Sequence, residues 1–170
     1  MGRLLPVVFL LLVVGGCAFQ RKATPTPGLF TPATPAEGDT ALLTRTDRAQ
    51  GGVTVEATLV TPEHLRAMGK PALEKFPLGE YLLFHVKVDT HSVDLGRYNL
   101  VALSALQWDT QGRLPSTAWV PLQESAHHRE GVLVFAYPGE KGLTGRGELA
   151  LVIKGLAGVP ERILRWGTAR

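Results

Sequence analysis

The chain of 170 residues contains only one cysteine, Cys17, and only one asparagine. A single thiol cannot form an internal disulfide, so a folded domain in this chain must be stabilised by the burial of apolar side chains. The chain also lacks a large excess of either charge, because it has 18 Lys and Arg and 15 Asp and Glu. The basic residues are scattered along the sequence. Nucleic-acid binding needs a massed basic surface, and we therefore exclude nucleic acid as a partner.

Long hydrophobic runs are lacking as well. The longest apolar stretch, Leu4 to Val14, has eleven residues, whereas a membrane-spanning helix needs about 20. Arg3 precedes this stretch, and Gly15 and Gly16 follow it. A positive residue, a short apolar segment and small residues before a cleavage point are typical of a secretory signal. Residues 1–16 are therefore predicted to be a signal peptide.

The residues Val14, Gly15, Gly16 and Cys17 stand together at the end of this segment. They resemble the lipobox of bacterial lipoproteins, and the alternative is an ordinary secretory signal beside a stray cysteine. The resemblance implies a diacylglyceryl thioether and an acylated amine at Cys17, which together form a permanent membrane anchor. Ala18 stands where an Asp would resemble an inner-membrane retention signal. We expect an exported protein, lipid-anchored to the cell membrane or the outer membrane.

The segment that follows, residues 17–40, is rich in proline and threonine and lacks apolar periodicity. Proline favours extended polyproline II, at about 3.1 Å per residue, so this linker reaches on the order of 60 Å from the bilayer. The remaining residues, 41–170, are enough for one ordinary domain. The predicted organisation is thus a signal peptide, a lipidated cysteine with a linker, and one domain.

Period-two alternation of apolar and polar residues dominates this domain. It is clearest in 53–60 and 82–89, which indicates strands with one buried face. Further candidate strands are 99–108, 117–121, 132–137, 148–154 and 162–166, with an extra one near 42–46. The pattern breaks at 61–79, where Thr61 can cap a short helix, Pro62 suits its first turn and Gly69 ends it. This segment is interpreted as a short helical insertion.

Seven or eight short antiparallel strands predict an all-β fold, in which two sheets pack as a sandwich. This arrangement resembles the immunoglobulin-like sandwich in architecture, and a closed barrel is the alternative. Such folds carry many unrelated functions, so the fold alone predicts none.

Successive antiparallel strands are connected at alternating ends of a sheet, which sorts the histidines. His91, His127 and His128 are predicted to share one end, His64 to lie at the other end, and His85 to lie in mid-strand on the less apolar face. Neutral imidazole binds Cu(II) and Zn(II), so the three histidines of the shared end form a candidate copper or zinc site. The alternative is that these residues belong to solvated turns whose side chains satisfy backbone groups.

Motifs of catalysis are lacking. The chain has no Gly-rich phosphate loop, no His-Glu-x-x-His sequence and no Cys-x-x-Cys pair, and we expect that it is not an enzyme. The leading hypothesis is a membrane-anchored binding module that presents a rim of Thr90, Asp94, Arg129 and Glu130 to an unknown partner in the cell envelope.

Overall fold

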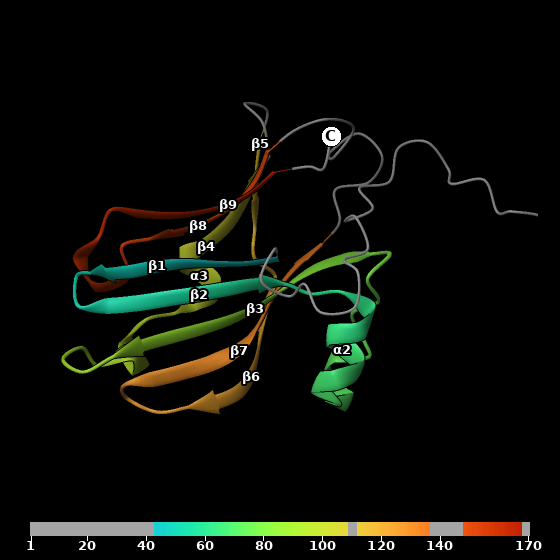
Figure 1. Ribbon diagram of the computed structural model, residues 1–170, viewed down its shortest axis with the longest axis horizontal. Coiled ribbons are helices and arrows are strands. Elements are labelled where there is room, and N and C mark those ends of the chain that lie inside the picture. The colour runs from blue at the N-terminus through green and yellow to red at the C-terminus, as the bar shows by residue number, and fades with distance from the viewer. Residues whose placement is uncertain (1–42, 109–111, 137–147, 168–170) are drawn as a thin grey trace, which may run out of the picture.

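The computed structural model describes residues 43–108, 112–136 and 148–167. In these ranges nine strands form two antiparallel sheets (Figure 1), which confirms the all-β prediction. The strands are β1 (Thr44–Gln50), β2 (Val53–Leu59), β3 (Tyr81–Thr90), β4 (Ser104–Trp108), β5 (Gly112–Pro115), β6 (Ala118–Glu124), β7 (His128–Ala136), β8 (Glu148–Lys154) and β9 (Glu161–Gly167). The predicted signal peptide, Cys17 and the linker lie outside the described residues.

The chain passes between the two sheets several times. The five-stranded sheet has the order β1-β2-β3-β7-β6, and the four-stranded sheet has the order β5-β4-β8-β9. The chain therefore crosses between the layers after β3, after β5 and after β7. Strand β3 lies in the middle of its sheet, between β2 and β7.

The strand count differs from the prediction of seven or eight. The additional strand is β5, which is not among the predicted strands, and the predicted strand 99–108 begins only at Ser104. Before it, Asn99 Oδ1 accepts hydrogen bonds from the amides of Val101 and Ala102 and starts the helical turn α3 (Leu100–Leu103). The capping side chain satisfies helix amides that have no other partner, and this overrides the strand-like pattern.

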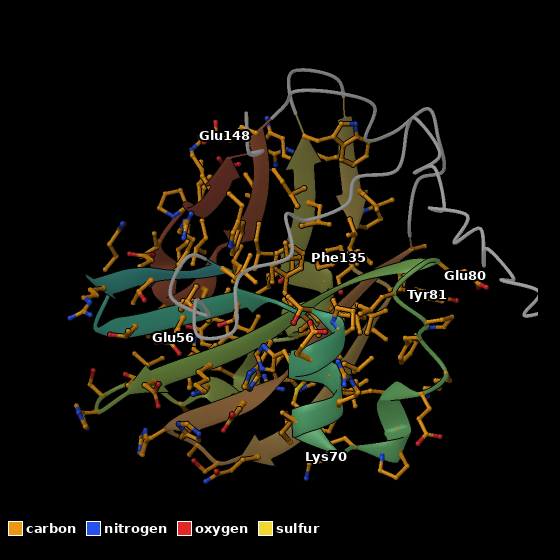
Figure 2. All side chains as sticks on the ribbon, turned by 45° about the vertical axis from the view of Figure 1, so that its right-hand side comes forward. Glu56, Lys70, Glu80, Tyr81, Phe135 and Glu148 are labelled. Carbon is orange, nitrogen blue, oxygen red and sulfur yellow. The ribbon has the colours of Figure 1, made fainter. Side chains whose placement is uncertain are left out.

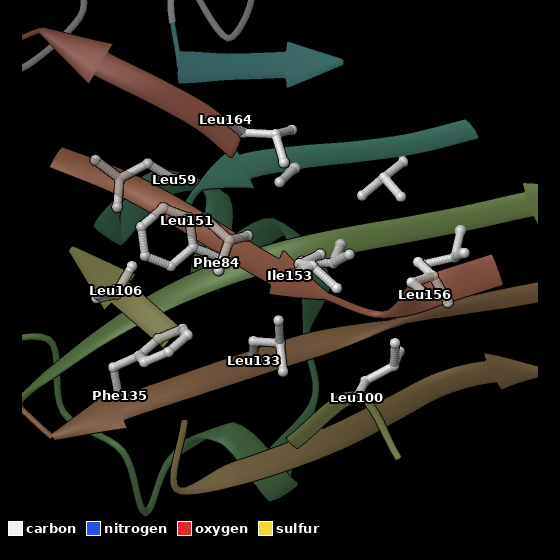
Figure 3. Packing of buried hydrophobic residues seen from close by; sticks show 14 of the residues in the cluster. Leu59, Phe84, Leu100, Leu106, Leu133, Phe135, Leu151, Ile153, Leu156 and Leu164 are labelled. Atoms are coloured by element: carbon white, nitrogen blue, oxygen red, sulfur yellow. The ribbon is translucent and has the colours of Figure 1, made fainter. Parts of the chain in front are cut away.

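The main core lies between the two sheets. Figure 3 shows side chains from both layers meeting there, including Phe84 and Phe135 from one sheet and Leu151 from the other. The two phenylalanine rings pack edge to face, with their centroids 5.8 Å apart. The alternating residues of each strand thus supply the burial that a chain without disulfides needs.

A second, smaller core lies on the outer face of the five-stranded sheet. Helix α2 (Pro62–Met68) begins at Thr61, whose side chain accepts from the His64 amide, and ends at Gly69 in the left-handed conformation. The helix and the 3₁₀ turn η1 (Pro71–Leu73) follow β2 and cover apolar residues of this face (Figure 2). The predicted helical insertion is therefore confirmed. The other short turns are η2 (Leu95–Arg97) and η3 (Leu156–Gly158). Of the helices that the structure describes, none has the length and hydropathy to span a bilayer.

Among the described residues, one charged side chain is buried in the interior. Arg162 alternates with the inward-facing Leu164 and Trp166 of β9, and its side chain is 0% exposed. Its guanidinium forms an ion pair of 2.7 Å with Asp47 of β1 and donates to the backbone oxygens of Gln50 and Val53. These bonds connect β9 of one sheet to the β1–β2 hairpin of the other.

We predict that Arg162→Ala lowers the free energy of unfolding by about 3 kcal/mol or more, because removing one member of a buried ion pair leaves the other without its partner. Arg165→Ala is the matched control on the same strand. Arg165 pairs with Glu148 at the surface, so its loss should cost less than about 1 kcal/mol. Urea unfolding of both variants measures the difference, and equal losses would contradict the role assigned to Arg162.

Candidate functional site

The outer face of strand β3 changes character along its length. Leu83 faces the second core, whereas the next outward residues are His85, Lys87 and Asp89. In the neighbouring strand β7, Glu130 lies opposite Lys87 and His128 lies opposite Asp89. Two adjacent strands thus place a set of titratable side chains on one face of the sheet.

Five of these side chains make a continuous chain of contacts, which we call the histidine–carboxylate row: His64, His85, Glu130, His128 and Asp89. His64 Nε2 lies 3.1 Å from His85 Nδ1, and His85 Nε2 lies 2.7 Å from Glu130 Oε1. The other oxygen of Glu130 is 3.8 Å from His128 Nε2, and His128 Nδ1 contacts the Asp89 carboxylate. The row runs from helix α2 to the end of the β3–β7 pair.

The protons of the first half of the row can be assigned from its chemistry. A carboxylate only accepts, so His85 donates its Nε2–H to Glu130. Neutral His85 then carries a lone pair on Nδ1, which accepts the Nε2–H of His64. Glu130 therefore determines which nitrogen of His85 faces the helix.

Helix α2 is the element that brings His64 into the row. The prediction that His64 lies at the opposite end from the other histidines is wrong, because the helix folds back against the sheet and its first turn lies over mid-strand β3. The two imidazole rings pack edge to face, with their centroids 5.2 Å apart. Apolar residues of the helix, Leu65 and Met68, cover the second core and thereby fix the position of His64.

His64 is held in its neutral form. Burial lowers the pKa of His64 below its usual value of 6.5, and the positive charges of Lys87 and of a protonated His85 lower it further. Its other ring nitrogen, Nδ1, is buried and has no hydrogen-bond partner among the described residues. Neither tautomer of this ring therefore gains a bond at Nδ1.

The charges around the row are predominantly acidic. Glu56 of β2 lies opposite Lys87, and their charged atoms are 3.7 Å apart. With neutral histidines, the carboxylates of Glu56, Asp89 and Glu130 stand against the single ammonium of Lys87, which makes the local charge −2. The whole chain has a formal charge of +3. This face is thus an acidic region on a mildly basic protein, and it favours cations.

The three histidines of the predicted metal site lie at one end of the sheet. His127 donates from Nδ1 to the Val93 carbonyl at 3.2 Å, and its own carbonyl accepts from the Thr90 amide. His128 belongs to the row through Asp89, and His91 is exposed in the turn after β3. Within the described ranges no three or more His, Cys, Asp or Glu side chains form a group that could hold a metal ion. Metal binding by His91, His127 and His128 stays a prediction.

The residues predicted to contact a partner bond to neighbouring turns and strands of this chain. Thr90 donates to the Gly52 carbonyl and accepts from two amides of the following turn, and Asp94 accepts from the Gly96 amide at 2.9 Å. Arg129 binds Glu124 at 2.6 Å and donates to the Tyr98 carbonyl at 2.7 Å. Its guanidinium also lies over the Trp119 ring. These bonds shape the rim, and the fourth predicted residue, Glu130, belongs to the row.

Sequence reasoning missed the row as a unit, although part of its signal was present. His85, Lys87 and Asp89 recur at every second residue, as His128 and Glu130 do, which is the pattern of one strand face. That pattern does not predict the pairing of these two strands or the position of the helix.

Comparison with known proteins found no matching family model, no matching curated protein and no matching solved structure.

We predict that the pKa of His64 makes the protein less stable in acid. Because this pKa is lower in the folded state than in the unfolded state, the unfolded chain binds more protons below 6.5. The contribution of His64 to the free energy of unfolding is therefore complete above pH 6.5, and it is lost as the pH falls through the folded-state pKa of this residue. His64→Gln should lose less of its unfolding free energy than the native chain between about pH 7.5 and 5.5. The exposed His91→Gln serves as control, and equal losses in the native chain and His64→Gln would contradict the assignment.

Proposed function

We propose that the protein is exported, lipid-anchored through Cys17 to the cell membrane or the outer membrane, and acts as a binding module in the cell envelope. The observation that carries the proposal is the position of the only cysteine, directly after an apolar segment of eleven residues and two glycines. The linker to residue 40 would hold the folded domain away from the membrane surface.

The strand order supports an immunoglobulin-like architecture for this module. The neighbours β2-β3-β7-β6 correspond to the order A-B-E-D of immunoglobulin domains, and β5-β4-β8-β9 correspond to C′-C-F-G. Strand β1 is then an addition at the edge. Domains of this architecture commonly bind through the loops at one end of the sandwich, which is where the rim lies.

The rim is the proposed partner-binding surface. It joins the turn after β3 with the turn before β7, and the bonds of Thr90 and Arg129 hold these two turns in place. Exposed side chains such as His91 project from a backbone that is already ordered. Such preorganisation lowers the entropic cost of binding. We expect no catalytic activity from this surface.

The anchor is tested by expressing the full chain in a bacterial host with radiolabelled palmitate. We expect label and membrane association in the native chain, and loss of both in Cys17→Ala, because no other thiol can take the lipid. Ala18→Ser is the control that keeps the cysteine. Absence of label in the native chain would overturn lipidation.

The binding surface is tested by a photo-crosslinking amino acid placed at His91 of the anchored chain in whole cells. We expect a discrete crosslinked band from this position. The same group at Ile163, a 40% exposed residue of β9, is the control. A band that forms equally from both positions, or from neither, would contradict a partner at the rim.

A further inference from the structure

We propose that His64 and His85 form a binding site for a divalent transition-metal ion that prefers imidazole, such as Zn(II) or Cu(II), with Glu130 as the carboxylate that orients His85. Its two ligands are not among the rim histidines, although Glu130 also lies 3.8 Å from His128, and the site does not depend on the lipid anchor. The proposal starts from two ring nitrogens of different elements, His64 Nε2 and His85 Nδ1, which lie 3.1 Å apart.

The distance fits two ligands of one ion. With a metal–nitrogen bond of about 2.05 Å, two nitrogens 3.1 Å apart subtend roughly 100° at the metal. This angle lies between the right angle of square-planar coordination and the tetrahedral angle. Binding one ion between them therefore requires the two imidazole rings to rotate but requires little movement of the backbone.

The contacts around His85 are those of a metal ligand. Histidines that bind metals usually donate their second ring N–H to a carboxylate, which fixes the tautomer and raises the basicity of the ligating nitrogen. Glu130 accepts from His85 Nε2 at 2.7 Å and leaves the lone pair on Nδ1, toward His64. The His85 side chain is 12% exposed and lies in the middle of a central strand, so its position is well fixed.

His64 can release the proton that now lies between the two rings. Its Nδ1 has no hydrogen-bond partner in the described part of the chain, so moving the proton from Nε2 to Nδ1 sacrifices only the bond to His85. A metal ion would replace that bond.

The site would use two protein ligands and leave the other positions to water or small anions. The three carboxylates near the row outnumber Lys87 and favour a cation. With only two protein ligands we expect a Kd of about micromolar. Because the ion would connect helix α2 to strand β3, binding should raise the Tm of the protein.

The test uses the full chain carrying Cys17→Ala, purified in detergent through a tag without histidine, so that neither the thiol nor the tag binds metal. Calorimetry follows Zn(II) and Cu(II), with Mg(II) as an oxygen-preferring control. We expect binding of both transition metals and none of Mg(II). The electron paramagnetic resonance spectrum of the Cu(II) complex should show coupling to two imidazole nitrogens.

The variants separate this pair from the rim. His64→Gln and His85→Gln should each weaken binding at least roughly tenfold, and Glu130→Gln about tenfold through the orientation of His85. The double variant His91→Gln, His127→Gln leaves the pair intact and should bind as the native chain does. Circular dichroism without metal checks that each variant is folded.

Either of two results would overturn the proposal. The first is that the chain with an intact row binds neither Zn(II) nor Cu(II). The second is that binding survives in folded His64→Gln and His85→Gln. Loss of binding in the double rim variant would instead place the ion at the rim. The lipid labelling at Cys17 is independent of all these outcomes.

Discussion

Strands β3 and β7 pair from Tyr81 opposite Ala136 to Asp89 opposite His128, and this register determines both faces of the five-stranded sheet. Inward, it places Phe84 and Phe135 in the main core. Outward, it aligns His85 and Asp89 with the glutamate and histidine of β7. A shift by one residue would turn every one of these side chains to the other face, which would bury charge and expose the core. The large cost of that exchange keeps the row assembled.

The same outer face explains where helix α2 docks. One part of the face is apolar and another is titratable, so the helix covers the apolar part and its first turn reaches the boundary. His64 stands at that boundary, where partial burial keeps its imidazole neutral. His64, which completes the row, is therefore positioned by the apolar packing of helix α2 and not by interactions of its own imidazole.

The Arg162 ion pair and the histidine–carboxylate row have different consequences. Arg162 is fully enclosed and its bonds are directed to β1 and to backbone oxygens, which suits a role in joining the sheets. The row is partly open to solvent, since the side chains of His128 and Asp89 are 30% and 52% exposed. A closed ion pair stabilises one structure, whereas the partly exposed row is where we propose that a metal ion binds.

The sequence by itself determined the all-β class, most strands and the helix at Thr61, because alternation and capping are local properties of the chain. It also carried the argument for export and for Cys17, which rests on residue order alone. The conformation of residues 99–103 could not be predicted from this alternation, because the hydrogen bonds of the Asn99 side chain favour a helical turn over a strand. Only the tertiary structure decided that His64 meets His85, and that His128 joins them through Glu130. These contacts join residues that are 21 and 45 positions apart, and they depend on strand pairing and helix docking that no local pattern encodes.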